Sequence, residues 1–227
     1  MKKEVLIAEF LGTFLLVFFG CGAVVVDTLF GGDLGHVGIC IVFGLVVMAV
    51  IYSFGNVSGA HINPAVTIAL CFAGRFELRL MPGYISMQLM GATSAALLLR
   101  WIFSETEILG LTLPNIDLFE AFFVEIVISF ALMSVVLNVG GDQQEKKIMA
   151  GAVVGGVVTL AALVAGPVTG ASMNPARSLG PAIAALNFES VWLYMVAPVI
   201  GMLLACPVFR WIQGQESSPS KGSSHET

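Results

Sequence analysis

The chain has 227 residues, of which 57% are hydrophobic and only 11% are charged, and its formal net charge is −5. Soluble globular domains carry about 25% charged residues, so this composition indicates a membrane protein. A transmembrane helix needs roughly 20 apolar residues, so the length accommodates about six spans and leaves no room for a separate soluble domain. The sequence contains no dense Lys/Arg cluster, which argues against nucleic-acid binding.

Six apolar windows, separated by Gly, Pro or charged residues, predict six transmembrane helices. In chain order they centre near residues 5–27, 36–55, 80–103, 118–139, 147–166 and 190–213. The first follows Lys2 and Lys3 as a secretory signal would, but it continues to about Val26 and carries Glu9. We therefore interpret it as an uncleaved span.

Two further apolar segments, His61 to Ala73 and Ser172 to Ala184, are too short to cross a bilayer. We expect each to form a half-helix that enters the membrane and returns on the same side. The last residues, 214–227, are rich in Ser, Gly and charge and cannot bury enough apolar area to fold. They are expected to form a disordered cytoplasmic tail.

The distribution of positive residues predicts the orientation, because short cytoplasmic connections retain Lys and Arg. With six crossings, most positive residues fall on one side: Lys2, Lys3, Arg75, Arg79, Lys146, Lys147, Arg210 and Lys221. Only Arg100 and Arg177 remain for the other side. Both termini are therefore expected in the cytoplasm, with the chain crossing a plasma or inner cell membrane several times.

An internal repeat relates the two halves of the chain. Ser58-Gly59-Ala60-His61-Ile62-Asn63-Pro64-Ala65 recurs as Thr169-Gly170-Ala171-Ser172-Met173-Asn174-Pro175-Ala176, 111 residues later. Each half holds three spans, an odd number, so the second copy is inverted relative to the first. We predict an all-α membrane protein with six transmembrane helices and two re-entrant half-helices. A single channel domain occupies residues 1–213, with inverted repeats at about 1–115 and 116–213.

Each repeat places an Asn-Pro pair at the expected start of a half-helix. Pro64 and Pro175 suit the first helical turn, where a missing N–H costs nothing, and Asn63 and Asn174 precede them. A single pair would be an ordinary helix cap. Two pairs at inverted positions are more informative, because irregular backbone at membrane depth is tolerated only where protein buries it or water meets it. The pattern therefore indicates a polar pore.

Cysteine and histidine show no pattern typical of a metal site. Cys21, Cys40, Cys71 and Cys206 are far apart and lie in or beside apolar runs, so we expect packing roles, no metal and no cofactor. The sequence also lacks a recognisable nucleophile or acid–base pair, so no enzyme activity is expected.

Paired Asn-Pro-Ala boxes on two half-helices resemble the aquaporin, or major intrinsic protein, family. The likeness includes Ala8 to Phe14 in the first span and Ser172 to Ser178 before the last, and it covers nearly the whole chain. The run from Gly166-Pro167-Val168 to Asn174 looks most like the nodulin-26-like branch and its bacterial relatives. The resemblance implies a passive channel for water and small uncharged solutes that excludes protons and ions. It also implies a homotetramer with one pore per subunit.

The resemblance assigns a role to individual residues. The box residues Asn63, Pro64, Ala65, Asn174, Pro175 and Ala176 would form the pore centre, with both Asn amides donating to a passing water. Backbone carbonyls of Gly59, Ala60, His61, Gly170, Ala171 and Ser172 would line the water file. Phe43, Ala162, Ala171 and Arg177 would form an outer selectivity filter. The intramembrane carboxylates Glu9 and Glu125 would accept hydrogen bonds from the re-entrant loops.

The sequence leaves the range of solutes open. Two alanines in the filter predict a wide constriction that suits glycerol, urea, boric acid or arsenous acid. Ser178 and Ala182 resemble the water-selective members instead, so a strictly water-selective channel is the first alternative. A secondary transporter also uses inverted repeats, but it would need coupling groups beyond Glu9, Glu125 and Arg177. His61 would either fix its loop or sense pH.

Overall fold

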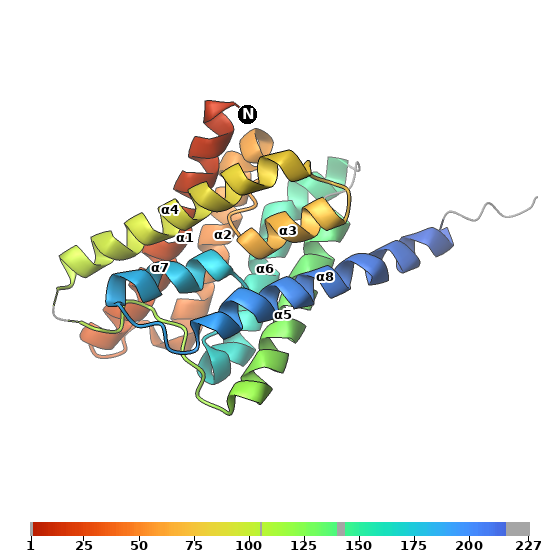
Figure 1. Ribbon diagram of the computed structural model, residues 1–227. Helices are drawn as coiled ribbons and strands as arrows, with labels where there is room; N and C mark the ends of the chain where they lie inside the picture. The colour runs from red at the N-terminus through yellow and green to blue at the C-terminus, as the bar shows by residue number, and fades with distance from the viewer. Residues whose placement is uncertain (1, 105, 140–143, 217–227) are drawn as a thin grey trace, which may run out of the picture.

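The protein is an all-helical bundle of six long helices, with two short helices that lie between two of the long ones (Figure 1). The computed structural model describes residues 2–104, 106–139 and 144–216, except for the side chains of 144–147 and 214–216. Its elements are α1 (Lys3–Leu29), α2 (Gly35–Ser58), α3 (Pro64–Phe72), η1 (Leu78–Leu80), α4 (Met81–Ile102), α5 (Leu118–Val139), α6 (Gln144–Thr169), α7 (Pro175–Ala185) and α8 (Val191–Glu216).

The six predicted spans correspond to α1, α2, α4, α5, α6 and α8, each long and apolar enough to cross a membrane. The half-helices begin at Pro64 and Pro175, directly after the extended cap residues Asn63 and Asn174, as the Asn-Pro pairs predicted. One boundary differs from the prediction. At the C-terminus, α8 continues to Glu216, so residues 214–216 extend the last helix and do not belong to a tail. Residues 217–227 lie outside the described part of the chain.

The long helices pack in equivalent pairs in the two halves. Helix α1 packs against α4 and α5 against α8, and in each pair a glycine lies against the partner's backbone. A Cβ atom at Gly91 would lie 2.3 Å from Phe10 O, and one at Gly201 would lie 2.2 Å from Ile126 O. Small residues allow membrane helices to approach this closely. The same packing rule therefore shapes both repeats.

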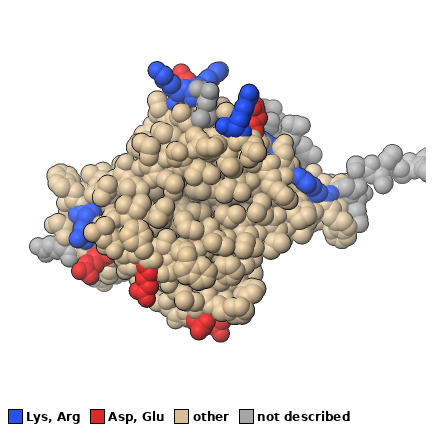
Figure 2. Space-filling model, viewed as in Figure 1, with Lys and Arg blue, Asp and Glu red and all other residues tan. Residues whose placement is uncertain are grey.

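The outer surface suits a lipid environment. Figure 2 shows charged residues confined to the ends and edges of the molecule, with a broad uncharged belt between them. Large apolar side chains are exposed on the long helices, among them Leu45 of α2, Val127 of α5 and Leu160 of α6, with exposed fractions of 51%, 63% and 62%. A hydrocarbon layer would cover these side chains and leave the charged ends in water.

Candidate functional site

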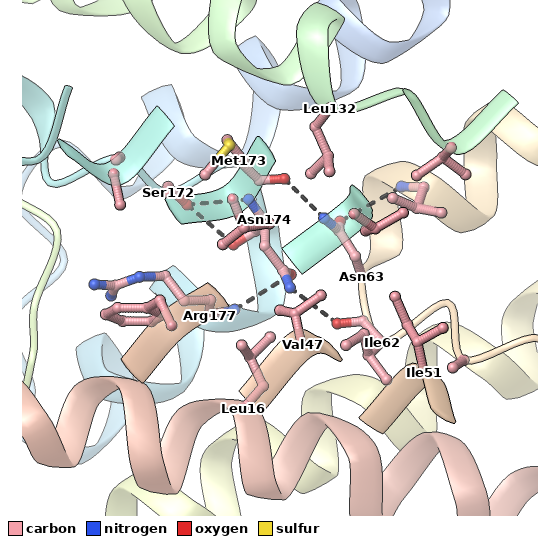
Figure 3. A pocket seen from close by; sticks show the side chains of 18 of the residues that line it. Leu16, Val47, Ile51, Ile62, Asn63, Leu132, Ser172, Met173, Asn174 and Arg177 are labelled. Atoms are coloured by element: carbon pink, nitrogen blue, oxygen red, sulfur yellow. Dashed lines mark hydrogen bonds between the residues drawn. The ribbon is translucent and has the colours of Figure 1, made fainter. Parts of the chain in front are cut away.

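A cavity of about 920 Å³ follows the inner face of α2. Its lining residues on this helix extend from His36 to Asn56. At a rise of 1.5 Å per residue these positions are about 30 Å apart, the thickness of a hydrocarbon layer. One wall is polar and belongs to the two re-entrant loops, whereas the opposite walls carry apolar side chains such as Leu16, Val47 and Leu132 (Figure 3).

Asn63 and Asn174 meet at the middle of this cavity. The Asn63 Oδ1 caps α3 by accepting from Ala65 N at 2.9 Å, and the Asn174 Oδ1 caps α7 by accepting from Ala176 N at 3.0 Å. With their oxygens committed to the caps, both side chains present their amide N–H groups to the cavity region. The two half-helices thus abut through their N-termini.

Each Asn amide also reaches across to the other re-entrant loop. Asn63 Nδ2 donates to Met173 O at 2.8 Å, and Asn174 Nδ2 donates to Ile62 O at 2.9 Å, as Figure 3 shows. An amide nitrogen carries two hydrogens, so each Asn keeps one for another acceptor. The reciprocal pair fixes both side chains and ties the two repeats together.

The loops that precede the caps have an unusual backbone. Ala60, Ile62, Ala171 and Met173 have φ values of +47°, +45°, +42° and +51°, although none is a glycine. Residues with a side chain pay about 1–2 kcal/mol for this left-handed conformation. The same two positions are strained in each repeat, so strong local interactions must hold the loops in place.

Glu9 supplies that interaction for the first loop. Its side chain is fully buried, and its Oε1 accepts from Ser58 Oγ at 2.7 Å and from His61 N at 2.9 Å. Its Oε2 accepts from Ile62 N at 2.8 Å and from Gln88 Nε2 at 2.7 Å. Hydrogen bonds to a carboxylate are stronger than neutral ones, so this group can hold a strained backbone.

Glu125 occupies the equivalent place in the second repeat. Its Oε1 accepts from Thr169 Oγ1 at 2.7 Å and from Ser172 N at 2.9 Å, and its Oε2 accepts from Met173 N at 2.9 Å. It is also fully buried. Both intramembrane carboxylates therefore accept hydrogen bonds from the backbone of a re-entrant loop, as predicted from the sequence.

Arg177 lies in the wall of the cavity. It is 4% exposed, its Nη1 donates to Gly110 O at 2.6 Å, and its guanidinium lies 5.1 Å from the centroid of the Phe43 ring. The carbonyl and the ring face together offset the cost of burying the charge. Gly110 belongs to the connection between α4 and α5, so this connection helps to position the Arg177 side chain.

The four predicted filter residues, Phe43, Ala162, Ala171 and Arg177, all line the cavity. The 111-residue repeat offset maps them onto Val154, Ile51, Ala60 and Val66, which also line it. This second set is entirely apolar. Of the two sets, only the predicted filter therefore carries a fixed positive charge.

The six predicted carbonyl-bearing residues, Gly59, Ala60, His61, Gly170, Ala171 and Ser172, line the cavity as well. His61 Nδ1 lies 3.2 Å from Thr67 Oγ1, and its ring packs against Phe76 and Tyr84 with centroid distances of 4.7 Å and 4.9 Å. The imidazole is thus held against α3, the segment that follows α3, and α4.

Comparison with known proteins decides the family. A protein-family model described as Major intrinsic protein matches residues 1–209 of the chain. The chain belongs to the major intrinsic protein family. As a member of this family it is a channel for water and small neutral solutes and not an enzyme. The channel class and fold predicted from the sequence are confirmed.

Individual relatives of this major intrinsic protein narrow the branch. Aquaporin NIP1-2 of Oryza sativa subsp. japonica is 48% identical over 210 residues, covering 88% of this chain and 69% of that protein. Probable aquaporin NIP4-2 of Arabidopsis thaliana is 44% identical over 210 residues, covering 92% and 74%. These matches confirm the predicted likeness to nodulin-26-like proteins.

A solved structure also resembles this major intrinsic protein. The X-ray structure of the aquaglyceroporin from Plasmodium falciparum aligns with a TM-score of 0.85 at 28% sequence identity. The alignment covers 94% of this chain and 97% of that one.

Several contacts of the channel site were not predicted from the sequence. Thr112 Oγ1 donates to Ser178 Oγ at 2.7 Å, and Ser178 Oγ lies 2.6 Å from Ser172 Oγ. Tyr84 and Tyr194 donate to Ser58 O and Thr169 O at 2.7 Å and 2.6 Å. The two tyrosines lie at nearly the repeat offset, a signal that an alignment of the two halves could have revealed.

Proposed function

We propose that the cavity is a single-file pore that conducts water and neutral solutes up to the size of glycerol, while excluding protons and other ions. The reciprocal Asn63–Asn174 arrangement is the observation that carries this proposal, because it places two fixed donors beside one point of the cavity.

Proton exclusion follows from the hydrogens that remain on these amides. One N–H of each Asn is bonded to the opposite loop, so the second is free to donate to a water oxygen. A water that accepts from both amides must turn its own hydrogens outward, toward the two ends of the file. Neighbouring waters then point in opposite directions, which interrupts a continuous proton wire.

The half-helices add an electrostatic barrier at the same place. The N-termini of α3 and α7 meet there, and each carries the equivalent of about +0.5 elementary charge. Arg177 adds a full positive charge toward the outer end. Cations, including hydronium, are therefore repelled twice along the pore.

The proposed filter suits a small molecule with one polar and one apolar side. The Arg177 guanidinium offers donors, whereas Phe43, Ala162 and Ala171 offer an apolar surface without bulk. Loop carbonyls can replace the hydrogen bonds that a solute loses on leaving water. Glycerol, urea, boric acid and arsenous acid have the required size and neutrality.

Stopped-flow swelling of proteoliposomes tests this proposal, with water, glycerol, urea and boric acid compared in one preparation. We expect rapid water flow and glycerol permeation well above that of empty liposomes, without saturation. Retained water flow with glycerol flux equal to that of empty liposomes would establish the strictly water-selective alternative. Saturation at low solute concentration, or dependence on an ion gradient, would favour a secondary transporter.

We further propose that both termini face the cytoplasm and that the channel assembles as a homotetramer with one pore per subunit. Lys2, Arg75, Arg79 and Arg210 support this orientation under the positive-inside rule, with Arg100 on the opposite side. Reporter fusions at the two termini test the orientation. Detergent-corrected light scattering tests the assembly, and a monomer mass would contradict it.

A further inference from the structure

His36 completes a hydrogen bond that the neighbouring helix α6 cannot make for itself. It lies in the first turn of α2, lines the cavity, and its Nε2 lies 2.9 Å from Leu163 O of α6. In an uninterrupted α-helix this carbonyl would accept from the N–H of residue 167, but that residue is Pro167, which has none. Because a carbonyl oxygen only accepts, the His36 Nε2 carries the hydrogen and donates it.

The carbonyls that follow at the end of α6 all have partners. Gly166 O accepts from Gly170 N, Pro167 O from Asn115 Nδ2, Val168 O from Asn115 N and Thr169 O from Tyr194 Oη. An unpaired backbone carbonyl at membrane depth is costly, because hydrocarbon offers no donor. Without His36, the Leu163 carbonyl would be left unpaired in an otherwise fully bonded helix end.

This bond joins α2 and α6 beside the proposed filter. Leu163 directly follows Ala162, and Phe43 lies about two helical turns after His36 on α2. The ring fits against α6 because residue 166 is a glycine, where a Cβ atom would lie 2.8 Å from His36 Cε1. The His36 contact therefore acts on the two helices that carry Phe43 and Ala162.

We propose that His36 is a positioning residue for solute selection, which fixes the separation of Phe43 and Ala162 by holding α6 against α2. This inference rests on the proposed channel function and adds to it the element that sets the width of the filter. Without the bond, α6 shifts until the Leu163 carbonyl finds another donor, and the separation increases. Glycerol gains more than water from a wider filter, because water is the smaller molecule.

Tyr52 makes a contact between the same two helices toward the other end of the cavity. Its hydroxyl donates to Ile148 O at 3.1 Å and accepts from Ala152 N at 3.2 Å, so it is inserted into a hydrogen bond of α6. When this hydroxyl is removed, the N–H of Ala152 can donate directly to Ile148 O. Tyr52→Phe thus removes a polar contact between α2 and α6 without leaving a carbonyl unpaired, and it is the matched control for His36.

The glycerol-to-water permeability ratio of proteoliposomes tests the positioning role, because this ratio does not depend on how many channels are folded. His36→Leu keeps an apolar side chain but has no donor, and it should raise the ratio about fivefold, the factor that one neutral hydrogen bond contributes to an equilibrium. His36→Gln places an amide nitrogen as many bonds from the backbone as Nε2 and should restore the wild-type ratio. Tyr52→Phe should leave the ratio unchanged. An unchanged ratio in His36→Leu, or an equal rise in Tyr52→Phe, would overturn the proposal.

A thermal double-mutant cycle tests the bond itself without any transport measurement. His36→Leu should lower the melting temperature in detergent by about 2–4 °C. Pro167→Ala supplies the missing N–H, so in that background the same substitution should lower it much less. Equal losses in the two backgrounds would show that His36 does not replace the bond that Pro167 removes.

The outcome for the proposed function can be separated from the outcome for His36. If the wild-type protein conducts water but no glycerol, the broad solute range is refuted. His36→Leu should even then raise glycerol flux above that of the wild type, and a flux that stays at the wild-type level would overturn the positioning role.

Discussion

Replacement of Gly110 by alanine is expected to disturb the predicted filter without touching it directly. Gly110 has a φ of +72°, and a Cβ atom there would lie 2.4 Å from Cys21 Cβ and 2.8 Å from Cys21 Cα. The left-handed backbone costs an alanine about 1–2 kcal/mol. Overpacking against α1 adds about 1–3 kcal/mol. The Gly110→Ala variant should therefore lose about 2–5 kcal/mol of stability if the effects add.

The Gly110→Ala substitution is expected to change permeation by displacing the Arg177 side chain. A shift of the Gly110 carbonyl weakens its 2.6 Å bond to Arg177 Nη1, which for a charged donor is worth about 1.5–3 kcal/mol. The released guanidinium then moves into the pore, where water can hydrate its charge. If the displaced side chain raises the free-energy barrier for glycerol permeation by about 1 kcal/mol, glycerol flux falls about fivefold. Water, being smaller, should be slowed less.

Gly32→Ala is the matched control for this experiment. Gly32 has a φ of +83°, but no atom lies within 4 Å of the Cβ position, so this variant carries the left-handed cost alone. Thermal stability in detergent and the glycerol-to-water permeability ratio are measured for both variants. Equal stability and an equal ratio in the two would refute the positioning role of Gly110.

Three further predictions use the same two assays. Glu9→Gln replaces one acceptor oxygen with a donor and leaves two donors unpaired, so it should cost about 2–6 kcal/mol, whereas exposed Glu4→Gln should not change the melting temperature. Ala162→His should narrow the filter and reduce glycerol flux more than water flux; equal losses would show that Ala162 is not in the constriction. Gly201→Ala should force α5 and α8 apart and destabilise the channel by about 1–3 kcal/mol. Gly156→Ala, which meets no neighbouring atom, should stabilise it by about 0.5–1 kcal/mol, and the opposite order of the two would contradict the packing argument.

The parts of the fold that could be predicted from the sequence are those encoded by local patterns. Apolar length predicted the six spans, and the repeated Asn-Pro pairs predicted two capped half-helices. The caps are local, since the Asn63 Oδ1 bonds the backbone only two residues away. The inverted repeat then predicted that both caps would meet.

Contacts between distant segments were not predictable in the same way. Gln88 bonds Glu9, but the residue 110 positions later, at the spacing that relates Tyr84 to Tyr194, is Pro198, so the repeat gives no signal for this contact. Gly110 contacts Arg177 from a connection with no counterpart in the repeat pattern. His36 was uninformative in the sequence because its role depends on a carbonyl left free by Pro167, 131 residues away.

The hydrogen bonds from each Asn amide to the opposite loop also required the structure. The sequence suggested that both Asn amides donate to water, whereas in the structure each amide donates one of its hydrogens to a backbone carbonyl of the opposite loop. This bond orients the remaining hydrogen and makes the arrangement rigid. The predicted amide role is thereby restricted to one N–H from each side chain.

Water and proton permeability measured in the same proteoliposomes test the central claim most directly. Osmotic shrinkage reports water flow, and a pH-sensitive dye inside the vesicles reports proton flow under an imposed pH gradient. We predict that the protein raises water permeability well above that of empty vesicles while proton permeability stays at the empty-vesicle level. Proton flow that increases together with water flow would contradict the role assigned to Asn63 and Asn174.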